Sequence, residues 1–299
     1  MTNTSLDTAL GFTIPHRHAR GRVLRLGPAL DTILSKHAYP PVVANLLAEA
    51  LTLAALLGST LKEDGGRLTL QAQAEGGAVD LLVVDYEGGV LRGYVRHDAD
   101  RIAEMPVDPS LFALFGKGYL AITFDLPAIG ERYQGIVPLE GASLAEAAES
   151  YFAQSEQLPS IIRLSAARDA DGRHVAGGML IQHLPEGEEG RDRIHTRMDH
   201  PEWDHVRALA ETVKPGELTD GYLALDGLLW RLFNEEEVRT LPALALSQSC
   251  RCDPEHFRSV IARFPADERA EMADENGQIH VDCEFCSTRY SISLESLEA

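Results

Sequence analysis

The only four cysteines of this 299-residue chain lie in its last fifty residues, in two close pairs. Cys250 and Cys252 flank a single arginine, and Cys283 and Cys286 follow after a spacer of thirty residues. A tetrahedral site of four thiolates needs such an arrangement, because each pair supplies two corners of the tetrahedron. The pattern therefore predicts that Cys250, Cys252, Cys283 and Cys286 bind zinc.

The spacing of the first pair also indicates redox chemistry. Structural zinc sites mostly place two or more residues between paired cysteines, whereas only Arg251 separates Cys250 from Cys252. The sulfurs of a tetrahedral zinc site lie about 3.8 Å apart, but a disulfide needs about 2.05 Å. Oxidation of a pair therefore withdraws two ligands at once, and we interpret all four cysteines as redox-active as well as metal-binding.

Four cysteines allow three disulfide connectivities. Bonds between distant cysteines, such as Cys252–Cys283, would keep a long loop cross-linked, a constraint of roughly 3 to 4 kcal/mol. Local bonds, Cys250–Cys252 and Cys283–Cys286, would abolish that constraint. Because each pair is already adjacent, we predict the local pairing and a disordered module after oxidation.

Other interpretations of the cysteines remain open. A static zinc ribbon fits the spacing equally well. A thioredoxin-like dithiol at Cys283 and Cys286 is disfavoured, because no βαβ pattern surrounds the pair. His280 could replace one cysteine as a ligand, but with four thiolates at hand it is better explained as a strand side chain.

The surrounding module, residues 246–299, has few large apolar side chains, so it depends on the metal for its stability. Binding energy of a structural zinc, on the order of 10 to 16 kcal/mol near pH 7, becomes folding energy in such a module. Removal of zinc should therefore unfold it.

Upstream, the pattern predicts an α+β core. Residues 42–61 are mostly Leu and Ala but include Glu49, which favours a buried core helix over a membrane span. Glycine pairs at intervals of eleven and twelve residues indicate a meander over residues 65–98. Ser143 is a candidate N-cap with Glu146 as its capping-box partner, for a helix over residues 143–157. Further strands are expected at residues 119–126, 133–137, 161–166 and 174–183.

After Leu184 the sequence becomes charged and rich in Gly and Pro, which marks a linker or domain edge. Two amphipathic helices follow, over residues 201–213 and 220–233, with Tyr222 expected on the apolar face of the second. Isolated helices this short are marginal in water, so they must dock on a neighbouring surface. We therefore divide the chain into a core (1–185), a metastable helical linker (186–245) and a zinc-binding redox module (246–299).

Composition excludes several classes of function. The chain has 27 Lys and Arg against 46 Asp and Glu, a net charge of −19, which disfavours nucleic acid and anionic membranes as partners. The N-terminal residues have no secretory pattern, so a cytoplasmic location is expected. No H-E-x-x-H, G-x-S-x-G or Walker motif occurs, and we predict a protein that is not an enzyme.

The order Cys-x-Cys, thirty residues, Cys-x-x-Cys resembles the redox-regulated 33 kDa heat-shock chaperone family of bacterial cytosolic holdases. Three further segments agree with that resemblance: 155–159 (Ser-Glu-Gln-Leu-Pro), 177–182 and 228–238 with its Glu-Glu-Glu-Val end. The resemblance covers most of the chain. One departure is Ser287, where the family pattern leads us to expect glycine, so the local turn should be stiffer.

The resemblance implies a chaperone that is inactive when reduced and zinc-bound. Oxidation to two local disulfides would release zinc, unfold module and linker, and allow a homodimer to bind unfolding client proteins. We place the client surface on Leu225, Leu228, Leu229 and Leu232, because exposed apolar patches bind unfolded chains. The alternative is a zinc-ribbon interaction module whose acidic core docks a basic partner; it would lose function with zinc, whereas the chaperone would gain it.

Overall fold

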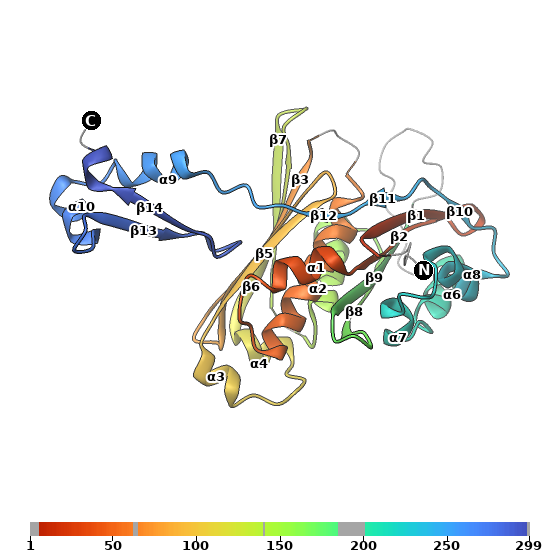
Figure 1. The fold of residues 1–299 in the computed structure, drawn as a ribbon. Helices are drawn as coiled ribbons and strands as arrows, with labels where there is room; N and C mark the ends of the chain where they lie inside the picture. The colour runs from red at the N-terminus through yellow and green to blue at the C-terminus, as the bar shows by residue number, and fades with distance from the viewer. Residues whose placement is uncertain (1–5, 62–64, 140, 185–200, 298–299) are drawn as a thin grey trace.

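Two β-sheets enclose one long helix, and a small module extends from them at the C-terminus (Figure 1). The structure is a computed structural model that describes residues 6–61, 65–139, 141–184 and 201–297. The predicted α+β class is confirmed. The charged stretch at 185–193, predicted to begin the linker, lies outside the described residues.

The first sheet has the strand order β10-β1-β2-β9-β8, with β11 also paired to β1, and every pairing in it is antiparallel. Its core strands confirm the predicted strands at 161–166 and 174–183, the second with the expected bounds. The strands are β1 (Thr8–Ile14), β2 (Ala19–Leu26), β8 (Ser160–Arg168), β9 (His174–His183), β10 (Arg239–Thr240) and β11 (Leu244–Ala245).

The second sheet has the order β12-β5-β4-β3-β6-β7 and contains the predicted meander. Gly88 and Gly89 form the two-residue turn between β4 and β5, and both have positive φ, as a tight hairpin of this length requires. The strands are β3 (Arg67–Glu75), β4 (Val79–Glu87), β5 (Val90–His97), β6 (Lys117–Leu126), β7 (Glu131–Pro138) and β12 (Ser247–Gln248).

The predicted core helix is α2 (Pro41–Gly58), which lies between the two sheets and contacts both. It is long and apolar enough to span a membrane, but 78% of it is buried inside the protein. Pro41 occupies its first turn, where the missing N–H costs no hydrogen bond. The helix is therefore the centre of the main hydrophobic core.

The helix predicted at 143–157 is split. Its α-helical part, α5 (Leu144–Tyr151), continues as a π-helical turn, η2 (Phe152–Glu156). Ser143 caps α5 through a bond from the Glu146 amide, as predicted, but the Glu146 carboxylate accepts from the amide of Ala142, so the expected reciprocal capping box is wrong by one residue. Three short helices complete the core: α1 (Pro28–Leu34), α3 (Ala99–Ala103) and α4 (Leu111–Phe115).

Three helices cover the outer face of the first sheet, on the side away from α2 (Figure 1). They are α6 (Pro201–Ala210), α7 (Pro215–Thr219) and α8 (Leu225–Phe233). The predicted apolar face of α6 is buried, but the prediction for Tyr222 is wrong: this side chain is 98% exposed. The reason is that α8 begins only at Leu225, and Asp220 accepts the amide of Tyr222 in a turn before it.

Buried polar groups also fasten these helices to the core. The side chain of Arg25, on β2, has no exposed surface and donates to the carbonyl oxygens of Leu218 (2.8 Å), Leu223 (2.7 Å) and Glu217 (3.0 Å). The carbonyls of Glu217 and Leu218 lie in the last turn of α7, where no intrahelical donor remains for them, and that of Leu223 lies in the turn before α8. Burial lowers the pKa of Arg25 to about 10. The Arg25 anchor therefore fixes the position of the helices, but it also removes a positive charge from water.

A second anchor lies beyond α8. The Glu236 carboxylate accepts from Arg17 (2.8 Å), which follows β1, and contacts His205 of α6 (2.9 Å). Hydrogen bonding from Arg17 holds the pKa of Glu236 below its usual range. This carboxylate therefore joins the core to both ends of the helical layer.

The C-terminal module consists of two helices and one hairpin (Figure 1). Its elements are α9 (Pro254–Ile261), α10 (Ala266–Met272), β13 (Gln278–Asp282), β14 (Arg289–Ser293) and a short 3-10 turn, η3 (Leu294–Leu297). Ile279, Ile292 and Cys283 are its buried residues after Leu246. A core of this size agrees with the expectation that the module needs a further source of stability.

We expect Arg25→Met to loosen the helical layer, because three carbonyls of α7 and of the turn before α8 would lose their donor, at a cost of about 1 to 3 kcal/mol. Hydrogen exchange over residues 201–233 should become faster in the reduced protein, while the two sheets stay protected. Arg22→Met is the matched control: Arg22 lies on the same strand but donates to Ser59 and Gly21 of the core. Equal exchange in the two variants would contradict the anchoring role.

Candidate metal centre and its contacts with the core

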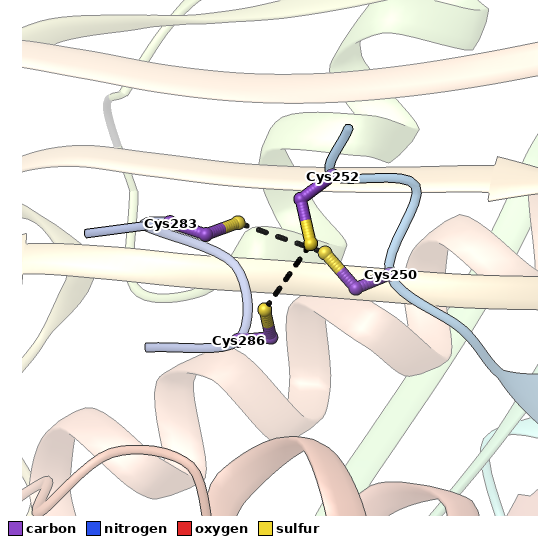
Figure 2. Close-up of side chains that lie close together, drawn as sticks. All are labelled: Cys250, Cys252, Cys283 and Cys286. Atoms are coloured by element: carbon purple, nitrogen blue, oxygen red, sulfur yellow. Dashed lines mark hydrogen bonds between the residues drawn. The ribbon is translucent and has the colours of Figure 1, made fainter. Parts of the chain in front are cut away.

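The four cysteine side chains point toward one another from two separate segments (Figure 2). The Sγ atoms of Cys250 and Cys283 are 3.6 Å apart, and those of Cys252 and Cys286 are 3.7 Å apart. All four sulfurs lie within 4.8 Å of one another. No disulfide joins them, and Cys283 is the most buried of the four.

Each segment is shaped by local hydrogen bonds. Asp253 caps α9 directly after Cys252, accepting the amide of Glu255, and so ends the Cys-x-Cys segment at a fixed point. At the other motif the amides of Cys286 and Ser287 donate to the carbonyl of Cys283, at 3.2 and 2.7 Å. Ser287 has a φ of 53°, in the left-handed region that favours glycine. Ser287, where glycine was expected, therefore lies where the turn is strained for a side chain.

The sulfurs differ in their electrostatic surroundings. Burial raises the pKa of the Cys250 thiol to about 12. Burial acts in the same direction on Cys286, but hydrogen bonds from the Thr288 hydroxyl and amide, together with the neighbouring cysteines, lower its pKa to about 7. The Tyr290 hydroxyl lies 2.9 Å from the Cys252 sulfur. The pKa of Cys286 is thus lower than that of Cys250.

The donor set fits a soft divalent metal ion. A tetrahedron with metal–sulfur bonds of about 2.3 Å has edges of about 3.8 Å, close to the two separations above. The Tyr290 hydroxyl and the amides near Cys283 supply hydrogen bonds to the sulfurs, as outer partners do at metal sites. His280 lies in β13 and contacts Asp274 and Ser291 instead, so it is a strand side chain, as predicted. The four cysteines are able to hold a metal ion.

Residues inside the two motifs dock the module on the core. Arg251, between the first two cysteines, pairs with Asp85 of β4 (3.3 Å) and with Glu87 of the same strand. Asp85 is mostly buried and also pairs with Arg92 of β5 (2.6 Å). The backbone that carries two of the sulfurs therefore shares a charge network with the second sheet.

Phe285, between the last two cysteines, makes the other contact. The guanidinium of Arg92 lies 4.0 Å from the centre of its ring, and Tyr94 packs edge-on against it at 4.9 Å. Its carbonyl is 3.4 Å from the His37 ring, whose other nitrogen contacts the Ser287 hydroxyl at 3.2 Å. A change of backbone in either cysteine motif would therefore disturb the contact with the core.

The four leucines predicted to bind clients, Leu225, Leu228, Leu229 and Leu232, are all buried between α8 and the first sheet. They pack on the first sheet and do not line the metal centre. The sequence patterns did not single out Tyr290, Thr288 or Arg25. Tyr290 and Thr288 had one available signal, which is that they follow the last cysteine by two to four residues.

The fold and site define a class of two-sheet α+β proteins with a terminal module of four metal-binding cysteines. The family model for the Hsp33 protein matches residues 7–293, and the chain belongs to the Hsp33 family. A 33 kDa chaperonin of Caulobacter vibrioides is 44% identical over 293 residues, covering 96% of this chain and 94% of the relative. That of Ectopseudomonas mendocina is 40% identical, with coverages of 97% and 94%.

A solved structure agrees with the fold. The 33 kDa chaperonin (HSP33) of Thermotoga maritima superposes with a TM-score of 0.79 at 24% identity, over 98% of this chain and 97% of that one. These relatives are named as chaperonins and not as enzymes, which agrees with the prediction for this chain. The predicted family is therefore confirmed, and the protein is a chaperone of the Hsp33 family.

We expect Tyr290→Phe to weaken metal binding by about tenfold, because outer hydrogen bonds to ligands typically contribute that much or more. Competition for zinc against a chromophoric chelator, under reducing conditions, measures the affinity. Tyr94→Phe serves as the control, since its ring contacts Phe285 but no cysteine. An affinity unchanged by Tyr290→Phe would exclude its hydroxyl from the metal centre.

Proposed function

We propose that this protein is a redox-regulated holdase of the bacterial cytoplasm. In the reduced state Cys250, Cys252, Cys283 and Cys286 hold zinc, and the chaperone is inactive. Oxidation of the cysteines unfolds the module and the helical linker, and the protein then binds unfolding clients. The observation that carries the proposal is the cluster of four free sulfurs, placed directly after a linker that covers a large apolar surface.

The redox step balances with a peroxide as oxidant. Each disulfide forms from two thiolates by loss of two electrons to one hydrogen peroxide, which takes up two protons and leaves as two waters. Two disulfides therefore consume two peroxides. Because either disulfide withdraws two of the four ligands, metal retention ends with the first bond.

We propose the local pairing, Cys250–Cys252 and Cys283–Cys286. Sulfur separations of 3.6 and 3.7 Å run between the motifs, so proximity in the folded module does not by itself select it. Sequence adjacency favours the local pairing. Once the module loosens, partners thirty residues apart must close a long loop, whereas partners within one motif remain neighbours.

The coupling from module to linker follows from the contacts of the motifs. Closing Cys250–Cys252 or Cys283–Cys286 reshapes the backbone that carries Arg251 or Phe285, so their contacts with Asp85, Arg92 and Tyr94 are lost. The linker helices are too short to persist alone. They depend on their apolar contacts with the first sheet and on the buried charges of Arg25 and Glu236.

We propose that the face of Leu225, Leu228, Leu229 and Leu232, and the sheet surface beneath it, bind clients after release. The surface of the sheet is formed by Phe12, Ile14, Val23, Met179 and Ile181. Both the leucine face and the sheet surface are buried in the closed state, so the reduced protein would be inactive.

The remaining parts of the proposal concern assembly and partners. The oxidised protein forms a homodimer, and its partners are unfolding polypeptides rather than nucleic acid or membranes. The charge supports the exclusion: residues 250–299 carry five Arg and Lys against eleven Asp and Glu, so the module repels phosphates.

Light scattering from a thermally unfolding client tests the switch. We expect suppression of aggregation only after peroxide treatment, with one zinc released per chain and two local disulfides in the peptide map. Equal behaviour in both redox states with zinc retained would leave the cysteines a static structural role. Long-range disulfides with retained ellipticity would contradict the local pairing.

The leucine face is tested in the oxidised state, in which the linker is released with or without the substitution. We expect Leu229→Gln to lower the amount of client held per chain by at least twofold, because it removes apolar surface from the centre of the face. Trp230→Gln is the matched control, since Trp230 is on the same helix but 68% exposed on the other side. Unchanged client binding by Leu229→Gln would place the client surface elsewhere.

A further inference from the structure

An extended segment connects the linker helices to the first cysteine and covers an edge of each sheet (Figure 1). This edge segment comprises residues 239–248. Its strands β10 and β11 pair antiparallel with β1, and β12 pairs in parallel with β5. The amide of Leu241 donates to the carbonyl of Gly11, and that of Leu246 donates to Asp7, both at 2.8 Å.

Main-chain hydrogen bonds dominate the attachment of the edge segment. All of its side chains are exposed except that of Leu246, which is buried in the main core. Such a segment has little apolar area to hold it, so it depends on attachments at its two ends. Its last residue, Gln248, lies two positions before Cys250. Unfolding of the cysteine module and of the linker helices would remove both attachments.

Removal of the edge segment exposes the free edge of β1 over its whole length. Main-chain groups of alternate residues in a strand point to the same side. Since Asp7 and Gly11 bond the edge segment, Ala9 and Thr13 present their groups to it too, and both are register partners of this segment. An unpaired edge of this kind is a template for another extended chain.

We propose that the edge of β1 is a strand-addition site, where an extended segment of an unfolding client replaces the edge segment. This inference rests on the proposed function and deepens it. Main-chain hydrogen bonds give affinity without regard to side-chain sequence, which suits a protein that must hold many different clients. The edge segment is the occupant in the closed state and shows that an extended chain fits.

The site lies beside the apolar surface proposed above. Phe12 and Ile14 of β1 are buried beneath the linker helices, so a client strand added at this edge would place alternate side chains next to that surface. β5 offers a shorter site, because β12 covers only Val90 and Leu91 of it. We therefore assign the client to β1.

Thr13→Pro tests the edge, because proline removes one edge-facing amide from β1 and leaves its bonds to β2 in place. In the oxidised state, client held per chain should fall by at least threefold, with zinc release and disulfides unchanged. Thr13→Val keeps the amide and should bind clients as the natural protein does. Equal client binding by Thr13→Pro and Thr13→Val would overturn the proposal while leaving the holdase function intact.

Hydrogen exchange of the unaltered protein provides a second test that needs no variant. In the oxidised protein the amides of Ala9, Gly11 and Thr13 should exchange quickly and regain protection, at least tenfold, when client is bound. Exchange that does not respond to client would overturn the proposal. Protection that appears without client, at concentrations where dimers form, would assign the edge to a second copy and would also overturn it. Failure to suppress aggregation at all would instead contradict the proposed function.

Discussion

The convergence of four sulfurs within 4.8 Å is the constraint on which the C-terminal module and its position on the core depend. The module around them buries few large side chains, so its fold has no adequate hydrophobic source of stability. Both cysteine motifs also carry the residues that dock the module on the core, Arg251 and Phe285. The geometry of the sulfurs and the position of the module are therefore linked through the same few backbone bonds.

Buried charges hold the layer of α6, α7 and α8 in its position on the first sheet. Arg25 and Glu236 fix the position of the helices through directional bonds, but each takes a charged group out of water. Buried ionic groups commonly specify an arrangement more than they stabilise it, because desolvation offsets much of the Coulomb gain. Release of the helices would return these charges to solvent. A layer held in this way has a specific closed position, but opening it requires little free energy.

The edge segment connects the layer of α6, α7 and α8 to the cysteine module. It begins at residue 239, after α8, and runs along an edge of both sheets. It ends at residue 248, two positions before Cys250. Gly89 permits the close passage, since a Cβ there would lie 2.6 Å from the carbonyl oxygen of Ala245. Unfolding at either end of the edge segment would therefore detach it from β1 directly, and no separate conformational pathway is needed. In the proposed mechanism the sheet edge and the apolar face would become available together, because the edge segment that covers one directly follows the helices that cover the other.

Local sequence patterns were enough to predict the clustering of the four cysteines, the family, the core helix and most strands, because ligand spacing, apolar runs and glycine turns are local features. The buried apolar face of α6 agrees, for the same reason, with the amphipathic helix predicted at residues 201–213. Three features could not be predicted in this way: which sheet face α6, α7 and α8 cover, that Tyr222 lies outside, and that Arg25 is an interior anchor. The Arg25 anchor depends on partners nearly 200 residues apart, and no local period records such contacts. The exposure of Tyr222 depends on the turn that precedes α8.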